Sequence, residues 1–304
     1  MTQPTRAPEA GFSADWLRRR EPFDARARDS AAPRLALASR LAALRPPAGT
    51  PWRVMDLACG TGANLRWLAP RLGGAQQWLV VDHDAALLRR WPRQLAAAQG
   101  RAPQRVAAGQ PLRFAAPGFD AQVLRRRLDL AQQLEALPWQ AAHLVTASAL
   151  LDLVSADWLQ RLAAAATARR VALLLALSVD GRHQWTPRDP DDGAVGARFA
   201  AHQRRDKGFG PALGADAVPA LQRLLQAAGY RVHLARSDWW LDSRIDGAAL
   251  ALQRALVDGI AHAACEQDPP AAAALQGWRA RRQALAPRST LRVGHLDLLA
   301  LPPR

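Results

Sequence analysis

The chain lacks several features that would restrict its function. It has only two cysteines, Cys59 and Cys265, which are too few for a disulfide framework or a zinc site. The longest apolar run, residues 171–177, is far too short to span a bilayer, and residues 1–15 contain charges and no apolar core of a secretory signal. These absences predict a cytoplasmic protein without a metal site or a membrane partner.

Lysine is almost absent too. Lys207 is the only lysine among 41 basic residues, which with 26 acidic residues leave a net charge of +15. Such a charge suggests a nucleic-acid partner, but the arginines are scattered along helices and do not alternate with aromatic residues to form a stacking platform. We therefore interpret the charge mainly as solvated surface. Lys207 either persists by chance or stands where a compact ammonium is needed, and the sequence leaves both readings open.

The length and the hydrophobic pattern predict one α/β domain with additions. A chain of 304 residues, 49% of them hydrophobic, is long enough for a full doubly wound domain. Apolar segments alternate with helical patterns, as a parallel sheet requires. The expected strands are residues 53–58, 78–82, 123–128, 142–146, 171–178, 230–235 and 292–301, and residues 100–118 are expected to be a loop.

The remaining segments are expected to lie outside this alternation. Residues 1–50 are predicted as a helical extension, with helices at residues 15–20 and 24–44, the second interrupted by Pro33. The main domain is expected to comprise residues 51–304, which include two insertions. Insertions are expected at about residues 181–214 and 243–287, and the second is mostly helical.

The most informative stretch is residues 53–64, where an apolar strand enters a glycine turn and a helix follows. A second apolar strand then ends on Asp82. Glycines let the backbone approach a ligand, and a carboxylate at this position accepts hydrogen bonds from ribose hydroxyls. The dinucleotide fingerprint needs a third glycine where this chain has Leu65, and the phosphate-binding Walker loop needs a lysine that is not there.

The remaining pattern, Asp56-x-Ala58-x-Gly60-x-Gly62, resembles the cofactor motif of class I S-adenosylmethionine-dependent methyltransferases. In that family an acidic residue is usually followed by three alternating glycines, and Ala58 departs from the pattern at the first of them. The resemblance implies a doubly wound, Rossmann-like, seven-stranded and mostly parallel sheet whose last strand inserts antiparallel. It also implies S-adenosyl-L-methionine as the cofactor.

The resemblance further implies which residues bind the methyl donor. The expected donor-binding residues lie at or just after the ends of the first four strands: Asp56, Ala58, Gly60, Gly62, Asp82, His83, Asp129, Leu130 and Ser148. The first four would surround the methionine and ribose portions, and Asp82 would bind the ribose hydroxyls. His83 would stack on the adenine, and Asp129 and Leu130 would contact its edge. Asp129 equally fits the N-cap of a helix over residues 131–137.

The segment after the fourth strand bears on the acceptor. Family members that methylate amino groups of planar bases place Asn/Asp-Pro-Pro-Tyr/Phe there, whereas this chain has residues 146–152, Thr-Ala-Ser-Ala-Leu-Leu-Asp. The difference counts against base methylation and against a nucleic-acid substrate. Asp152 either faces the acceptor or caps the following segment.

Residues 202–211 of the first insertion combine charge with a Gly-Phe-Gly hinge. His202 is a candidate general base, and Arg204, Arg205 and Lys207 are candidates to bind a carboxylate or phosphate on the acceptor. The other interpretation is a solvated helix face that ends at glycine. In methyltransferases of this class an N-terminal extension often covers the active site, so residues 17–24 are either a lid or a surface helix.

The sequence therefore predicts a methyltransferase that acts on a small molecule, favouring an anionic one, by direct in-line displacement. Asp152, His202 and Lys207 are the candidate catalytic residues. An RNA or protein methyltransferase and a non-catalytic S-adenosylmethionine-binding module remain alternatives. The sequence does not determine the oligomeric state.

Overall fold

The structure is a computed structural model that describes residues 13–103, 106–107 and 109–303. Its strands are β1 Trp52–Leu57, β2 Gly74–Asp82, β3 Leu112–Ala116, β4 Phe119–Arg127, β5 Leu144–Ser148, β6 Ala172–Thr186, β7 Arg231–Arg236, β8 Trp239–Asp242 and β9 Thr290–Leu301. Its α-helices are α1 Ala14–Ala31, α2 Leu37–Leu44, α3 Ala63–Leu72, α4 Ala85–Ala98, α5 Leu130–Gln133, α6 Ala156–Ala168, α7 Asp192–Gln203, α8 Ala217–Ala227, α9 Gly247–Gln267 and α10 Ala272–Leu285.

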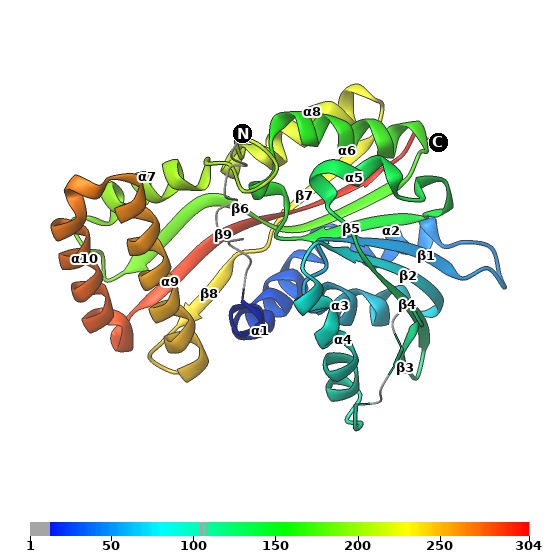
Figure 1. Cartoon of the computed structure of the whole chain (residues 1–304), viewed down its shortest axis with the longest axis horizontal. Coiled ribbons are helices and arrows are strands. Elements are labelled where there is room, and N and C mark those ends of the chain that lie inside the picture. Colours follow the sequence, from blue (N-terminus) through cyan, green and yellow to red (C-terminus); the bar gives the residue numbers. More distant parts are fainter. Residues whose placement is uncertain (1–12, 104–105, 108, 304) are drawn as a thin grey trace, which may run out of the picture.

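All strands belong to one sheet, shown in Figure 1, with the order β3-β4-β2-β1-β5-β6-β9-β7 and with β8 paired to β9. The strands β4, β2, β1, β5 and β6 run parallel, and β9 inserts antiparallel between β6 and β7. The chain leaves β1 toward β2 on one side and later returns to β5 on the other. This reversal places the ligand crevice outside the carboxyl ends of β1 and β5.

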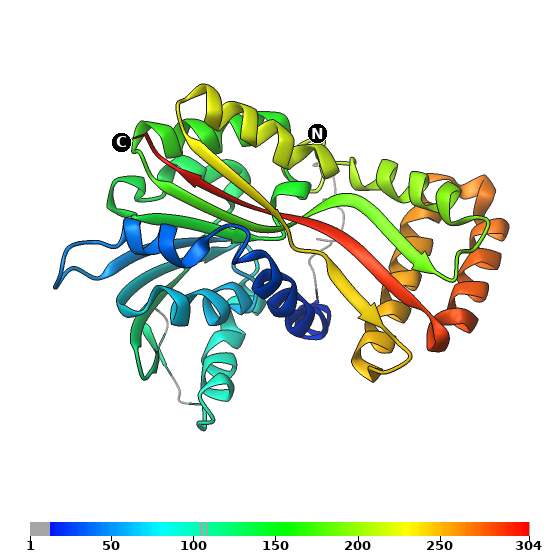
Figure 2. The same cartoon turned by 180° about the vertical axis from the view of Figure 1, so that it is seen from behind.

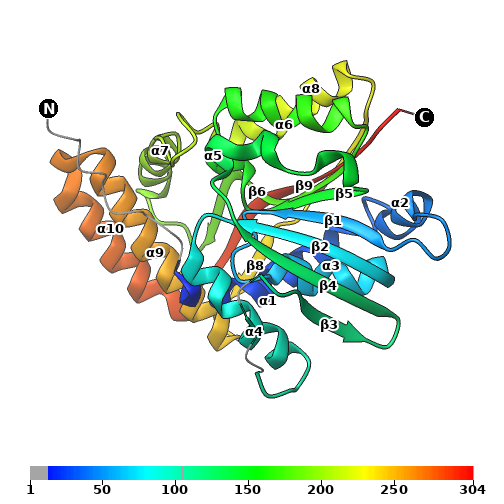
Figure 3. The ribbon, with the colours of Figure 1, turned by 45° about the vertical axis from the view of Figure 1, so that its right-hand side comes forward.

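Helices cover both faces of the sheet because successive strand residues point to opposite sides. In β1, Trp52 and Val54 pack into the cluster that contains residues of α2, α3 and α4. Met55 and Leu57 pack into a second cluster with residues of α5, α6 and α8. Figure 3 shows these two helical layers on either side of the sheet edge. The carboxyl-end edge of the sheet therefore remains the expected place of the crevice.

The strands β6 and β9 continue past this sheet as a long antiparallel pair, best followed in Figure 2. The helices α7, α9 and α10 pack around the extension and form a third apolar cluster, which includes Trp185, Trp239 and Trp278. Phe23 and Ala27 of α1 belong to the same cluster. Helix α1 thus lies where the core sheet and the extension meet.

The predicted fold class is confirmed, with three differences in detail. Over the described residues the sheet has nine strands, because β3 forms within the segment expected to be a loop and β8 follows β7. Strand β6 runs to Thr186, so the expected insertion at residues 181–214 begins as strand. Helix α1 passes through Pro22 without a break, and the interruption falls beside Pro33.

Among the helices that the structure describes, none is both long enough and apolar enough to cross a bilayer.

Candidate active site

The glycine turn after β1 has an unusual backbone conformation. Ala58, Gly60 and Gly62 all have positive φ angles, of 52°, 52° and 87°. This left-handed region suits glycine and costs an L-residue about 1–2 kcal/mol. Ala58 therefore adopts the conformation that a glycine would adopt easily, which explains why the departure from the family pattern preserves the turn. The strain lies at the candidate site, where such costs tend to concentrate.

Asp82 joins this turn to the end of β2. One oxygen of its carboxylate accepts the N–H of Gly60 at 2.8 Å, and the other accepts the N–H of Asp84 at 2.9 Å. The side chain is nearly buried, whereas His83 beside it is exposed. Each carboxylate oxygen can accept a second hydrogen bond, so Asp82 retains the capacity to bind hydroxyl groups.

A buried polar network lies behind the turn. The side-chain amide of Asn64 donates to Asp56 at 2.7 Å and to the hydroxyl of Thr146 at 3.1 Å. Nη1 of Arg28 donates to the amide oxygen of Asn64 at 2.8 Å. Burial raises the pKa of Asp56 to about 7 and lowers the pKa of Arg28 to about 10. Oδ2 of Asp56 and two nitrogens of Arg28 have no hydrogen-bond partner among the described residues.

Helix α1 covers the glycine turn. A methyl group of Leu17 lies so close that a Cβ added at Gly60 would be 3.2 Å from it. Glu21 forms a two-point ion pair with Arg66 of α3, at 2.7 and 2.6 Å, and Arg66 also donates to the carbonyl of Thr61. Of the two interpretations of residues 17–24, this placement favours a cover over the site.

The predicted adenine contacts Asp129 and Leu130 follow β4, and the predicted donor contact Ser148 ends β5. Asp129 accepts the N–H of Ala131 at 3.0 Å and so caps α5. Leu130 is buried, and its carbonyl accepts the indole N–H of Trp158 at 2.7 Å. Ser148 is half-buried at the last position of β5. All three therefore lie at the edge of the sheet where the crevice is expected.

Asp152 lies in the short helical turn Leu151–Leu153 after β5. It is 8% exposed, and its Oδ1 has no hydrogen-bond partner among the described residues. Burial raises its pKa to about 6, although the nearby guanidinium of Arg20 acts in the opposite direction. Asp152 is therefore a buried carboxylate whose pKa lies close to neutrality, a property that proton-transferring groups require.

His202 and Lys207 lie farther along the first insertion. Nε2 of His202 is 2.8 Å from Glu266 of α9. Arg204 pairs with Asp216, and Arg205 donates to Gln267 and to the carbonyl of Glu266. These contacts hold the end of α7 against its neighbours. Within the described part of the chain Lys207, which is exposed, forms no ion pair.

The loop at residues 204–213 packs against the start of α6. The ring of Phe209 meets that of Trp158 edge-on at 5.5 Å, and the N–H of Leu213 donates to the carbonyl of Val154 at 2.9 Å. Gly210 approaches Ser155, where an added Cβ would lie 3.3 Å from the serine side chain. The loop thus lies beside the carboxyl end of β5, close in sequence to Asp152.

Sequence reasoning did not identify the buried charges of α1. Arg20, Asp24 and Arg28 are each at most 9% exposed, and Arg20 binds Asp24 through two contacts at 2.9 and 3.2 Å. Their spacing of four residues puts them on one face of the helix. This spacing is the sequence feature that could have identified the three buried charges. It was missed because the neighbouring arginines at positions 18 and 19 made the whole segment look like surface.

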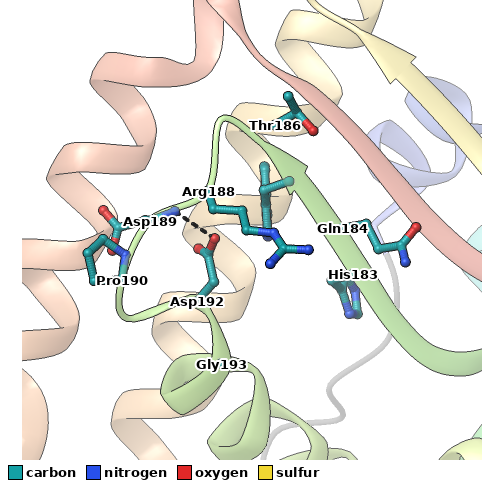
Figure 4. A pocket seen from close by; sticks show the side chains of 9 residues that line it. His183, Gln184, Thr186, Arg188, Asp189, Pro190, Asp192 and Gly193 are labelled. Atoms are coloured by element: carbon teal, nitrogen blue, oxygen red, sulfur yellow. Dashed lines mark hydrogen bonds between the residues drawn. The ribbon is translucent and has the colours of Figure 1, made fainter.

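A hollow of about 790 Å³ lies at the far end of β6, lined by residues of that strand and of the turn into α7. Figure 4 shows the Arg188 side chain extending from the turn toward His183 and Gln184 of β6, with Asp189 and Asp192 joined by a hydrogen bond. Eight residues separate Ser178 from Thr186, which at about 3.3 Å each is roughly 26 Å. The turn from β6 into α7 therefore lies well away from Ser178, whereas His183, which also lines the hollow, is nearer to it.

Residues 54–148 match a family model described as a methyltransferase domain. No curated protein sequence matches the chain.

Several solved structures are similar in backbone, at low sequence identity. A cyclopropane-fatty-acyl-phospholipid synthase-like protein from Lactobacillus casei has a TM-score of 0.48 at 15% identity, covering 96% of this chain and 95% of its own. A methyltransferase from Geobacter sulfurreducens with bound S-adenosyl-L-homocysteine has a TM-score of 0.38 at 14% identity, covering 89% and 90%. A geranyl diphosphate C-methyltransferase from Streptomyces coelicolor has a TM-score of 0.42 at 14% identity, covering 88% and 78%.

The match extends from β1 to β5 and so includes the glycine turn and the strand that ends at Asp82. Strand β9 has the antiparallel position that was expected of the last strand. Residues 54–148 are therefore similar to a methyltransferase domain, which agrees with the family that the motif around Gly60 and Gly62 resembles.

Proposed function

We propose that this enzyme transfers a methyl group directly to a small-molecule acceptor that carries an anionic group, and that Asp152 accepts the proton released by the nucleophile. The observation that carries the proposal is the place of Asp152. It lies just after β5, at the edge of the sheet where the donor would bind, and it combines burial with an oxygen that has no partner in the described structure.

The buried network behind the turn fits the methionine portion of the donor. That portion carries an ammonium group and a carboxylate. The free oxygen of Asp56 suits the first, and the two free nitrogens of Arg28 suit the second. In this proposal the backbone at Ala58, Gly60 and Gly62 lines the same portion.

The proposed ribose and adenine contacts follow the next strands. Asp82 would bind the ribose hydroxyls through its two remaining acceptor positions. His83, which is exposed beside it, would stack on the adenine ring. Asp129 and Leu130 would contact the ring edge, and Ser148 would contact the donor from the end of β5.

The donor supplies a methyl group on a positively charged sulfur, so the transfer needs alignment more than activation. The residues of this chain would orient the donor through Asp56, Arg28 and Asp82. Leu17, lying over the turn, would exclude water from it. Asp152 would hold the proton of the nucleophile and take it as the new bond to the methyl carbon forms.

A small acceptor is supported by the cover that α1 and the loop at residues 204–213 place around the edge of β5. His202 is paired with Glu266, so we assign the base to Asp152 and give His202 the task of holding α7 on α9. Lys207, which forms no ion pair in the described part of the chain, would bind the anionic group.

Calorimetric titration tests the proposal first. S-adenosylmethionine and S-adenosylhomocysteine should bind with micromolar affinity and NAD should not bind. Loss of S-adenosylhomocysteine formation in Asp152→Asn, with unchanged S-adenosylhomocysteine affinity, would support the assigned base. If the wild-type protein binds neither sulfur compound, the proposal is wrong and a non-catalytic role takes its place. An RNA substrate would instead be revealed by binding that weakens steeply with salt.

A further inference from the structure

We propose that His295 forms the acceptor site together with Asp152, and that the nucleophile held between them is a primary amine. This inference rests on the proposed function, since it assumes that Asp152 faces the acceptor. It adds a residue from the last strand of the sheet and a chemical class for the atom that is methylated.

The turn Leu151–Leu153, which carries Asp152, packs against β6, and His295 lies on the strand paired with β6. His295 of β9 is the direct partner of Val179 of β6 across their antiparallel pair, so the two side chains leave the sheet on the same face. The backbone of Val179 lies beside the Asp152 carboxylate and contributes to its pKa. Arg20 of α1 acts on the pKa of both Asp152 and His295.

The groups around His295 are already engaged with one another. Arg20 is bound to Asp24, and the indole N–H of Trp239 donates to the same carboxylate at 2.9 Å. The ring of Trp239 lies 4.8 Å from that of His295, and the guanidinium of Arg20 lies over the indole at 5.1 Å. These contacts fix the walls of the site and engage Nε and Nη2 of Arg20, both oxygens of Asp24 and the indole N–H of Trp239.

Asp152 and His295 differ from these walls because each has a buried atom without a partner. His295 is 2% exposed and Asp152 is 8% exposed. Nδ1 of His295 and Oδ1 of Asp152 form no hydrogen bond with any described residue. An unpaired buried polar atom costs about 1–3 kcal/mol, so two of them in one region point to a ligand that supplies the missing hydrogen bonds.

The charge state of the pair favours a ligand that donates hydrogen bonds. Arg20, His183 and Asp238 are the charged or titratable groups that face His295, and burial together with the first two lowers its pKa to about 3. The imidazole is therefore neutral at physiological pH, and Asp152 is mostly ionised above its pKa of about 6. A carboxylate accepts hydrogen bonds only, and a neutral imidazole has one nitrogen that accepts.

A primary amine matches two such acceptors because it has two N–H groups and a lone pair. A hydroxyl has one hydrogen and can satisfy only one of them. The nearby guanidinium of Arg20 also disfavours the ammonium form, which has no lone pair to react. In the reaction the nitrogen lone pair forms a bond to the methyl carbon and the carbon–sulfur bond breaks. The sulfur leaves as a neutral thioether, and Asp152 takes one proton from the methylated ammonium.

The experiment compares amines with alcohols of the same skeleton. Wild-type enzyme is incubated with S-adenosylmethionine and one of two pairs of anionic acceptors, and S-adenosylhomocysteine formation is measured. The pairs are 4-aminobutanoate with 4-hydroxybutanoate and 3-aminopropanoate with 3-hydroxypropanoate. We expect turnover with the amine of at least one pair, at ten times the rate of its alcohol or more. His295→Leu should raise KM for that amine about five- to tenfold, the cost of one hydrogen bond, with kcat changed less.

Two further variants separate positioning from folding. His295→Gln keeps a hydrogen-bonding group and should recover part of the lost KM, whereas His262→Leu, which removes an exposed histidine of α9, should leave KM unchanged. S-adenosylhomocysteine affinity and melting temperature are measured for each variant.

Three outcomes would overturn the inference while S-adenosylhomocysteine still binds the wild-type enzyme: turnover of alcohols as fast as amines, no turnover of any amine, or an unchanged KM in His295→Leu. Failure of the wild-type enzyme to bind S-adenosylhomocysteine would instead overturn the proposed function itself.

Discussion

Replacement of Asp82 by alanine should remove most of the affinity for S-adenosylhomocysteine. The carboxylate already accepts the N–H groups of Gly60 and Asp84, so its oxygens are fixed at the edge of β2 before any ligand arrives. A ligand that adds two ribose hydroxyls to these oxygens forms charge-assisted hydrogen bonds without paying to orient the side chain.

The size of the effect follows from those bonds. Hydrogen bonds to a charged group contribute about 1.5–3 kcal/mol each, so two of them are worth at least about 3 kcal/mol, or roughly a hundredfold in Kd. The alanine variant also leaves the N–H groups of Gly60 and Asp84 without their acceptor. The free energy of unfolding should therefore fall by about 2 kcal/mol, which a domain of this size tolerates.

Asp84 provides a matched control two residues away. Its carboxylate accepts the N–H of Ala86 at 2.6 Å and of Leu87 at 3.3 Å and so caps α4. Asp84→Ala should lower stability by about 1 kcal/mol and leave the affinity unchanged. Both variants are titrated with S-adenosylhomocysteine by calorimetry and unfolded in urea. An Asp82→Ala protein that is folded and binds within threefold of wild type would refute the ribose assignment, as would an equal loss in Asp84→Ala.

Three other predictions concern the acceptor side and the cover. Activity should fall as pH drops below about 6, because Asp152 must be ionised to accept a proton. Asp152→Asn should be less active for the same reason. Because burial raises the pKa of Asp152 from 3.8 in the folded protein, the variant should also be about 2 kcal/mol more stable than wild type at pH 8, as measured by denaturant unfolding. Arg66→Ala should weaken S-adenosylhomocysteine binding about tenfold by releasing Glu21 and α1, while Arg18→Ala, which breaks only an exposed pair on the same helix, should have no effect in calorimetry. Lys207→Arg should lower turnover more than donor affinity, and a fully active variant would show that its compact ammonium is not needed.

The fold was predictable because its signals are local and strong. The apolar strand before Ala58 and the second strand ending at Asp82 each have a short pattern that determines both element type and position. The order of the sheet then follows from general rules of α/β connection. The strand β3 was not predictable in this way, since its hydrophobic alternation covers only five residues within a segment rich in glycine, proline and alanine.

The acceptor side was less predictable because it depends on contacts between distant segments. Arg28 and Asn64 are 36 residues apart, and Asp24 and Trp239 are 215 residues apart. No spacing rule connects such pairs before the chain is folded. His295 illustrates the point. Its neighbours in sequence, Gly294 and Leu296, do not distinguish it from an ordinary strand residue, and only its pairing with Val179 of β6 indicates its place in the fold.

The long pair β6–β9 has a consequence for how such an enzyme can diversify. The same two strands belong to the core sheet and carry α7, α9 and α10, so no flexible linker separates the donor end from the helical insertion. Their pairing is irregular at two places, one of them between Val179 and His183. There a Cβ added at Gly294 would lie 2.0 Å from the Asp180 carboxylate. Substitutions at this irregular pairing of β6 and β9 would change the angle between the core sheet and the helices α7, α9 and α10. The choice of methyl acceptor could then change through residues that contact neither the donor nor the acceptor.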